Sequence, residues 1–291
     1  MRKAFFGMAL GTLVLGLALA TTATGSSTSS AAIPGCKVSS LNLLTSGTLT
    51  LGTDNPAYPP WWGGTPKNPW KVSNPSSGKG YESAVAYAIG KRLGFARSAV
   101  KWTPVPFLKS YAPGKKPFDF YLAQVSYKPI RAKAVTFSTS YYDVNQAVVG
   151  LKDKPIAKVK TIAGLKPFKF GVPLGTTSYD YVVKYIKPSQ KPKVYNTLDL
   201  AVTALKNGQI DGLVVDFPTA YYVTAVQVPN SKILGQFPTA AGGEHFGVVL
   251  AKGNPLTACV NTALASLRTS GQLKHFQQTW LAKAAGAPVL R

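Results

Sequence analysis

The sequence has 291 residues, of which 45% are hydrophobic, and this length can bury one large core or two modest ones. Lys and Arg number 33 against ten Asp and Glu, so the formal charge is +23 and the chain attracts anionic partners. With two His, two Cys and no cluster of either, the composition argues against a catalytic metal, and we predict neither metal nor cofactor. No zinc-finger spacing occurs and the lysines are scattered, which argues against nucleic acid as a partner.

The N-terminal segment has the pattern of an export signal. Arg2 and Lys3 precede an apolar run over residues 4–20, which ends in small residues of the kind that a signal peptidase accepts. An uncleaved membrane anchor is the alternative, although a bilayer span needs roughly 20 residues. We predict a signal peptide over residues 1–25, a disordered tether over residues 26–36 and an extracytoplasmic location, in the periplasm or on the cell-envelope exterior. For such a chain, the charge favours an anionic cell-envelope polymer or anionic lipid as a further partner.

Two cysteines, Cys36 and Cys259, make up the even count that suggests one disulfide in an exported chain. The residues around Cys36 faintly resemble a lipoprotein box, which gives acylation of this thiol as the alternative. Because the box lies well past the apolar run, we expect the disulfide.

Strands and helices alternate along the rest of the chain. Apolar runs predict strands over residues 48–51, 118–123, 144–151, 168–172, 212–216 and 246–251. Helical periodicity predicts helices over residues 82–93 and 198–206, another that follows residue 178 and runs through residue 185, and two C-terminal helices separated by Gly271. Thr197 is expected to cap the helix over residues 198–206. This alternation predicts an α/β fold with mostly parallel sheets.

The segment 124–138, QVSYKPIRAKAVTFS, is the most specific pattern in the chain. It resembles the S/T-x-T-x-x-R-A-K-x-V-x-F-S segment of family 3 of the extracellular solute-binding proteins, which serve ABC importers of polar amino acids. Further matches follow the family's order and include Gly52-Thr53-Asp54, Tyr58-Pro59-Pro60-Trp61, Gly80-Tyr81-Glu82, Gly175-Thr176-Thr177, Asp211-Gly212 with Asp216, and Phe246-Gly247. Each motif alone is weak, but the ordered set over residues 47–281 is specific.

The resemblance implies two Rossmann-like lobes joined by two crossover strands, with the ligand between them and hinge closure burying it. We expect the first lobe over residues 37–143 and 247–291, and the second over residues 144–246. Both cysteines then belong to the first lobe, so their bond would not block the hinge. The implied function is a monomeric binding protein, not an enzyme, that delivers an amino acid-like ligand to a membrane ABC permease.

The same resemblance assigns roles to candidate ligand-binding residues, and the chemistry of these residues fits the roles. Arg131 offers a planar fork to a carboxylate. Thr176 and Thr177 lie where a strand leads into a helix, a position at which backbone N–H groups favour an anion. Asp216, after a buried strand, suits an ammonium group, although it could instead cap a helix. The remaining candidates are an aromatic wall and polar neighbours, namely Tyr58, Trp61, Ser126 and Lys128.

Departures from the family pattern leave the ligand side chain open. Lys128 replaces the usual Thr and Ile130 the usual Glu, so a free charge on Lys128 would favour an acidic or polar amino acid, whereas a solvated one would not. An insert over residues 63–80 adds Pro, Gly and Trp70 near the expected cleft. Trp61, Trp62 and Trp70 suit either the core or the lip of the cleft.

An enzyme on the same scaffold is the alternative function. Periplasmic cyclohexadienyl dehydratases, which act on prephenate or arogenate, resemble this family and need an acid to assist loss of a hydroxyl group. Glu244 or Asp54 would have to supply it here. We instead expect Glu244 and His245 at the second crossover between the lobes, in a hinge role.

Overall fold

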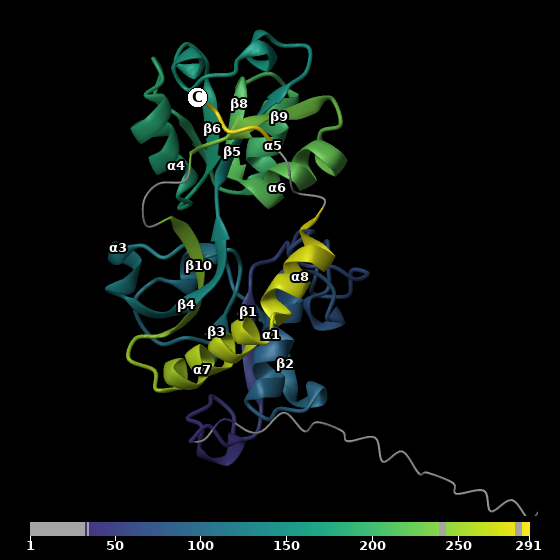
Figure 1. Cartoon of the computed structure of the whole chain (residues 1–291), viewed down its shortest axis with the longest axis vertical. Helices are drawn as coiled ribbons and strands as arrows, with labels where there is room; N and C mark the ends of the chain where they lie inside the picture. Colours follow the sequence, from purple (N-terminus) through teal and green to yellow (C-terminus); the bar gives the residue numbers. More distant parts are fainter. Residues whose placement is uncertain (1–32, 34, 239–242, 283–286) are drawn as a thin grey trace, which may run out of the picture. The chain divides into compact units, whose positions relative to one another are not determined.

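The computed structural model describes residues 33, 35–238, 243–282 and 287–291. The predicted signal peptide and most of the predicted tether lie outside these residues. The α/β architecture is confirmed, with helices covering two five-stranded sheets (Figure 1). In the described part of the chain, no helix is both long and apolar enough to cross a membrane.

The first sheet combines parallel and antiparallel pairs in the order β2-β1-β3-β10-β4. Strand β1 runs parallel to its neighbours β2 and β3, whereas β10 is antiparallel to both β3 and β4. The strand bounds are β1 Leu49–Thr53, β2 Val100–Pro104, β3 Phe120–Tyr121, β4 Val135–Val144 and β10 Glu244–Ala251. The expectation of mostly parallel sheets is therefore wrong here, because β10 returns from the second sheet and enters the first in the opposite direction.

Three long helices pack together on the first sheet: α1 Tyr81–Arg92, α7 Leu256–Thr269 and α8 Gln272–Trp280 (Figure 1). Their apolar faces join β1 and β10 in one buried cluster. Gly271 separates α7 from α8 with a φ of 72°, a conformation that a residue with a side chain rarely adopts. Shorter elements are α2 Phe107–Ser110, α3 Pro129–Ala132 and the 3₁₀ helices η1 Val38–Ser40, η2 Pro75–Ser77 and η3 Arg97–Ala99.

The predicted disulfide between Cys36 and Cys259 is present and joins the N-terminal end of the described chain to α7. Ile33 and Cys36 are both buried in the cluster of the first sheet. The end of the predicted tether is therefore part of the core, and the sulfur of Cys36 is engaged in a bond.

The second sheet is also mixed, in the order β7-β6-β8-β5-β9. Strands β6, β7 and β8 are parallel to one another, and β5 is antiparallel to β8 and β9. The strand bounds are β5 Gln146–Leu151, β6 Phe170–Pro173, β7 Lys193–Tyr195, β8 Gly212–Asp216 and β9 Ser231–Gln236. Strands β2, β4, β7 and β9 were not predicted, because no continuous apolar run marks them in the sequence.

Helices α4 Ser178–Tyr181, α5 Leu198–Lys206 and α6 Phe217–Tyr222 cover the second sheet, and π-helices continue α4 over Val182–Ile186 and α6 over Val223–Gln227. As predicted, the Thr197 hydroxyl caps α5 by accepting a hydrogen bond from the backbone N–H of Leu200 at 3.2 Å. The 3₁₀ helices η4 Pro155–Lys158 and η5 Ala163–Leu165 follow β5.

Residues 287–291 pack on the second sheet, although we expected the whole of 247–291 in the first lobe. Val289 forms an isolated bridge with Gln236 of the edge strand β9, and the side chain of Leu290 is 2% exposed. Gly235 leaves the space for it, since an added Cβ would lie 2.8 Å from Leu290 Cγ. In Figure 1 the C-terminus accordingly lies over the second sheet.

The insert over residues 63–80 folds onto the first sheet's side of the molecule. Ser83 of α1 donates its hydroxyl to the Pro75 carbonyl at 2.7 Å, and the Asn55 side chain donates to the Pro69 carbonyl at 2.8 Å. Trp61, Trp62 and Trp70 are 1%, 2% and 7% exposed. The three tryptophans are therefore buried, and Trp61 lies where the first lobe meets Thr219 of the second.

Candidate ligand-binding site

The candidate residues follow the carboxyl ends of parallel strands in both sheets. Strand β1 leads to Tyr58 and Trp61, and β3 leads to the segment that holds Arg131. In the second sheet, β6 leads to Thr177 and β8 ends at Asp216. Ligands of open α/β sheets bind outside the carboxyl ends of the strands, so the topology brings the candidates to the expected edges.

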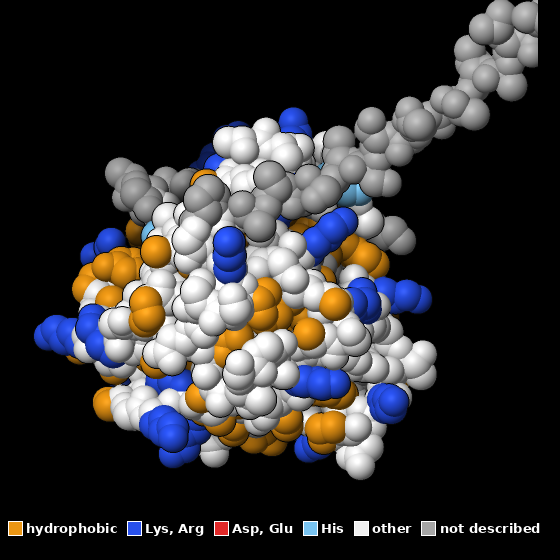
Figure 2. All heavy atoms as spheres, turned by 90° about the horizontal axis from the view of Figure 1, so that it is seen from below, with side chains coloured by type: hydrophobic (Ala, Val, Ile, Leu, Met, Phe, Trp, Pro, Cys, Tyr) orange, Lys and Arg blue, Asp and Glu red, His pale blue; other side chains and the backbone are white. Residues whose placement is uncertain are grey.

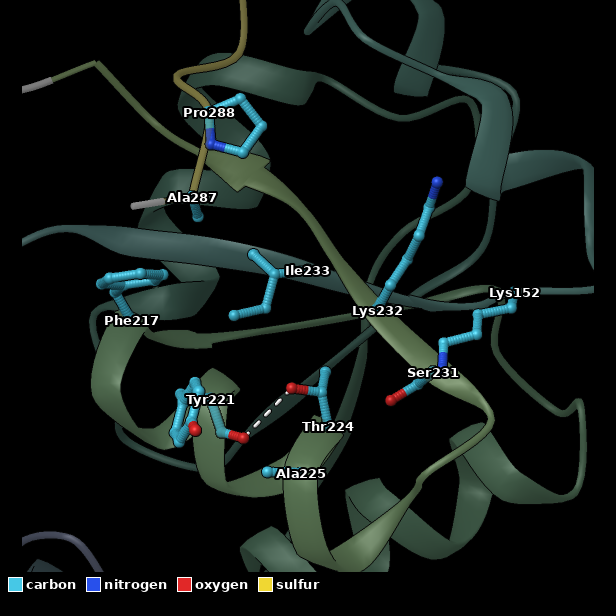
Figure 3. Close-up of a pocket in the computed structure, with 10 residues that line it drawn as sticks. All are labelled: Lys152, Phe217, Tyr221, Thr224, Ala225, Ser231, Lys232, Ile233, Ala287 and Pro288. Carbon is cyan, nitrogen blue, oxygen red and sulfur yellow. Dashed lines mark hydrogen bonds between the residues drawn. The ribbon is translucent and has the colours of Figure 1, made fainter. Parts of the chain in front are cut away.

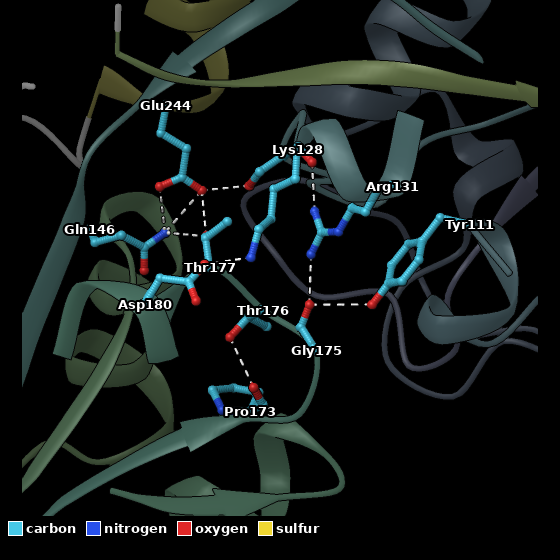
Figure 4. Close-up of polar contacts among 11 residues, drawn as sticks. Tyr111, Lys128, Arg131, Gln146, Pro173, Gly175, Thr176, Thr177, Asp180 and Glu244 are labelled. Carbon is cyan, nitrogen blue, oxygen red and sulfur yellow. Dashed lines mark hydrogen bonds and ion pairs between the residues drawn. The ribbon is translucent and has the colours of Figure 1, made fainter. Parts of the chain in front are cut away.

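Arg131 links the two lobes by its guanidinium group. The short helix α3 begins at Pro129, whose fixed φ suits a first helical turn, and carries Arg131 inward until it is 5% exposed. Its Nη1 donates to the Ser126 carbonyl at 2.5 Å, and Nη2 donates to the Gly175 carbonyl, on the second lobe, at 2.6 Å (Figure 4). The guanidinium carbon lies 4.5 Å from the Tyr111 ring centroid, within cation–π range.

Gly175 is where the second lobe comes closest to this guanidinium. Its φ is 75°, and an added Cβ would lie 2.4 Å from Leu108 Cδ2 and 2.6 Å from the Tyr111 hydroxyl. The Tyr111 hydroxyl donates to the same Gly175 carbonyl at 3.2 Å. A glycine is therefore required both by the turn and by the close approach of the first lobe.

The carboxylate of Glu244 joins candidate residues from both lobes by hydrogen bonds (Figure 4). It accepts hydrogen bonds from the hydroxyls of Ser126 and Thr177, each at 2.5 Å, and from Gln146 Nε2 at 3.2 Å. Ser126 belongs to the first lobe and Thr177 to the second, so hydroxyl donors from both sides converge on one carboxylate. Glu244 is the first residue of β10 and pairs with Val144, at the crossover where the sequence predicted a hinge.

Two of the candidates are engaged by neighbours. Lys128 Nζ forms an ion pair with the carboxylate of Asp180 at the start of the second lobe's α4. The Thr176 hydroxyl donates to the Pro173 carbonyl at 2.8 Å and closes its own loop. The positive charge of Lys128 is therefore offset, which removes the reason for expecting an acidic ligand.

Tyr58, Trp61 and Asp216 form a second group. Tyr58 donates its hydroxyl to Asp199 of α5 at 2.5 Å, and Trp61 Nε1 donates to the Thr219 hydroxyl at 3.1 Å. Asp216 caps α6, because Oδ1 accepts from the backbone N–H of Thr219 at 3.1 Å. Burial, with a smaller contribution from the negative charge of Glu244, raises the pKa of Asp216 to about 6, although hydrogen bonds from Thr219 act in the opposite direction. The prediction that Asp216 could cap a helix is thus confirmed. This backbone hydrogen bond uses Oδ1 and not Oδ2.

Acidic side chains gather near these residues although the chain is strongly basic. Of the ten Asp and Glu in the sequence, six are linked to the candidates. Asp216 is itself a candidate, Asp180, Asp199 and Glu244 pair or hydrogen-bond with candidates, and Asp54 and Glu82 interact electrostatically with Tyr58 and Asp216. Figure 2 shows Lys and Arg side chains across one outer face and no Asp or Glu. Acidic side chains therefore accompany the two basic candidates, Lys128 and Arg131, in this region.

Sequence reasoning missed several members of the site. Gln146, Asp180, Asp199 and Thr219 carried no motif signal, and Glu244 was expected only at the hinge. Its position two residues before Phe246-Gly247 is the one signal that could have pointed to it. Within the described ranges, no three His, Cys, Asp or Glu side chains gather in a way that could hold a metal ion.

Two surface cavities lie away from the candidate residues. One of about 390 Å³ is bounded by α6, β9 and residues 287–288, and in Figure 3 Phe217, Tyr221 and Ile233 form its apolar side. Another of about 550 Å³ lies between the end of β5 and residues 206–208. Neither contains a candidate residue, since direct hydrogen bonds connect the candidates from the two lobes.

Comparison with known proteins identifies the family. The model of the bacterial extracellular solute-binding proteins, family 3, matches residues 52–283. The chain belongs to this family. Among curated members, the ABC transporter arginine-binding protein 1 of Escherichia coli K12 is 29% identical over 168 residues, which are 56% of this chain and 66% of that protein. The match thus spans slightly less than two thirds of that relative's length.

A further sequence relative and a solved structure are also similar to this family 3 protein. The ABC transporter glutamine-binding protein GlnH of Bacillus subtilis 168 is 26% identical over 219 residues, 72% of this chain and 76% of that protein. A solved structure of an ancestral arginine-binding protein bound to arginine is 30% identical, with a TM-score of 0.65, and the match covers 80% of this chain and 98% of that one. The two-lobed fold predicted from the ordered motifs is thereby confirmed.

Proposed function

We propose that this protein captures a zwitterionic amino acid between its lobes by hinge closure and delivers it to an ABC permease in the membrane. The observation that carries the proposal is the convergence of hydroxyl donors from both lobes on one carboxylate, beside the buried guanidinium of Arg131. A donor set that holds the carboxylate of Glu244 has the chemistry to hold that of a ligand.

In this proposal Arg131, Ser126 and Thr177 bind the ligand carboxylate, and Asp216 binds the ammonium group. Thr176 supplies its backbone N–H, while Tyr58 and Trp61 form the apolar wall. Lys128 and Asp180 hold the lobes together at the rim. The lobes divide near residues 143–146 and 236–244, where β4 passes to β5 and β9 passes to β10.

The ligand is a polar or cationic amino acid rather than an acidic one. Six of the ten acidic residues lie among the candidates and their neighbours, and Lys128 is paired. Two relatives are named as an arginine-binding and a glutamine-binding protein. An exported, monomeric protein with a cleaved signal peptide fits a family described as extracellular.

Isothermal titration calorimetry with the individual amino acids tests the proposal. We expect saturable one-to-one binding of a polar or cationic amino acid, and Arg131→Ala should weaken it about a hundredfold, because each hydrogen bond to a charged group contributes about 1.5–3 kcal/mol. Arg97→Ala is the matched control. Arg97 also donates to a backbone carbonyl, at 2.8 Å, and lies 4.1 Å over the Tyr87 ring, but on an outer face.

Equal affinity in Arg131→Ala and the original protein would exclude the proposed carboxylate site. If none of the amino acids gave a heat of binding, amino-acid capture would be excluded as the function. The dehydratase alternative is examined separately by incubation with prephenate and arogenate, from which we expect neither phenylpyruvate nor phenylalanine.

A further inference from the structure

The end of the second sheet that lies opposite the candidate site carries a dense group of lysines. These lysines precede or begin the parallel strands β6 and β7 or end the helical segments that lead back to them. We call them the basic end: Lys160, Lys166, Lys169, Lys187, Lys191 and Lys193. The candidate ligand residues follow the carboxyl ends of the same strands, so the basic end belongs to a different surface.

Backbone contacts bring five of these lysines together from separate segments, and Lys160 is contacted by the C-terminal residue. The N–H of Ser189, between Lys187 and Lys191, donates to the Lys166 carbonyl at 2.9 Å. Lys193 pairs with Gly171 in the parallel ladder of β6 and β7, two residues beyond Lys169. The C-terminal Arg291 joins them, since its N–H donates to the Lys160 carbonyl at 3.4 Å.

None of the six lysines forms an ion pair in the described part of the chain, and Asp211 is the one acidic neighbour that we find beside them. All six side chains are exposed, and the ion pair found in the described part of the chain joins Lys128 to Asp180, away from this end. Asp211 is the carboxylate next to it, and its Oδ2 accepts a hydrogen bond from the backbone N–H of Lys169 at 2.8 Å. Clustered like charges without partners raise a positive potential that concentrates anions.

We propose that the basic end binds a flexible polyanion of the cell envelope. Lysines are hydrated point charges that suit diffuse attraction to many phosphates or carboxylates, whereas planar recognition of single groups uses arginine. The aromatic rings of this region, such as Tyr185 and Tyr195, are at least partly buried and offer no stacking platform for bases. The exposed apolar side chain among the lysines is Val194, too little to insert into a bilayer.

The test uses the full chain and long-chain inorganic polyphosphate as the probe. We expect measurable binding whose logarithm falls linearly with the logarithm of salt concentration between about 50 and 200 mM, the signature of counterion release. Converting Lys166, Lys169, Lys187, Lys191 and Lys193 to Gln should weaken binding at least about tenfold. Converting the same five residues to Arg should preserve it.

The matched control carries five Lys→Gln changes on the first lobe and therefore the same net charge: Lys67, Lys71, Lys79, Lys91 and Lys101, all exposed. We expect this control to weaken binding no more than about twofold. Circular dichroism and the unfolding midpoint check that both variants are folded.

Three outcomes would overturn the proposal. Equal losses in the two Gln variants would assign binding to the net charge alone. If the original chain did not bind polyphosphate at about 50 mM salt, the proposed polyanion site would be excluded. Vesicles containing phosphatidylglycerol that bind more tightly per phosphate than the polymer, and depend on the same lysines, would assign the basic end to a membrane surface instead.

Discussion

Glu82 provides the sharpest test of how this fold handles buried charge. Its side chain is 0% exposed, and its carboxyl group accepts hydrogen bonds from the backbone N–H of Gln124 at 2.7 Å, from the Gln124 amide and from the Tyr141 hydroxyl. Burial outweighs the lowering effect of these three hydrogen bonds and raises its pKa from 4.5 to about 7. Replacement by Gln keeps the shape and removes the ionisable group.

Between pH 4.5 and pH 7 the unfolded chain has lost this proton while the folded chain keeps it, so the free energy of unfolding falls as the pH rises. The difference between the two pKa values corresponds to about 3 kcal/mol at 1.36 kcal/mol per unit. We therefore expect Glu82→Gln to match the original protein near pH 4.5 and to be more stable by up to about 3 kcal/mol above pH 7.

Urea unfolding followed by tryptophan fluorescence, at several values between pH 4.5 and pH 8.5, measures this difference. Other titrating groups cancel when the two proteins are compared at each pH. Asp153→Asn is the matched control, because it removes a carboxylate from an exposed position. Stability curves of Glu82→Gln and the original protein that stay parallel across the whole range would refute the reasoning.

Three other predictions concern the disulfide and the candidate site. Replacing Cys36 and Cys259 by Ser opens a covalent loop of 223 residues and should lower the free energy of unfolding by about 2–5 kcal/mol in urea titrations; an unchanged midpoint would contradict this. Amino-acid affinity measured by calorimetry should weaken as the pH falls through about 6, where Asp216 gains its proton, and Asp216→Asn should abolish that dependence; a pH profile that survives the change would exclude this role. In Glu244→Gln the same pH midpoint should move lower, because a negative charge beside Asp216 is lost; a midpoint that stays in place or rises would argue against their coupling.

Where residue chemistry and motif order agree, the sequence selected residues that the structure brings close together. Ser126, Arg131 and Thr177 were selected by their motifs. The hydroxyls of Ser126 and Thr177 donate to the carboxylate of Glu244, and Arg131 donates to the Ser126 carbonyl. The hydrophobic pattern also predicted α1, α5 and β8. The two helices bury one face and so show helical periodicity, whereas β8 is almost completely buried and so shows a continuous apolar run.

What could not be predicted depends on contacts between distant segments. The pairing of Lys128 with Asp180 and the placing of Glu244 between Ser126 and Thr177 follow from how two lobes meet, and no local pattern records that. The direction of β10 likewise depends on where the chain re-enters the first sheet, which is why the mixed sheets were missed.

The two ends of the described chain are attached to different lobes, and this has a practical consequence. The disulfide fastens the N-terminal end to α7 of the first lobe, whereas Leu290 fastens the C-terminal end to the second sheet. Fluorescent reporters fused at the two ends would therefore each be attached to a separate lobe. Energy transfer between them would respond to hinge motion directly, so this chain suits conversion into a genetically encoded sensor for its own ligand.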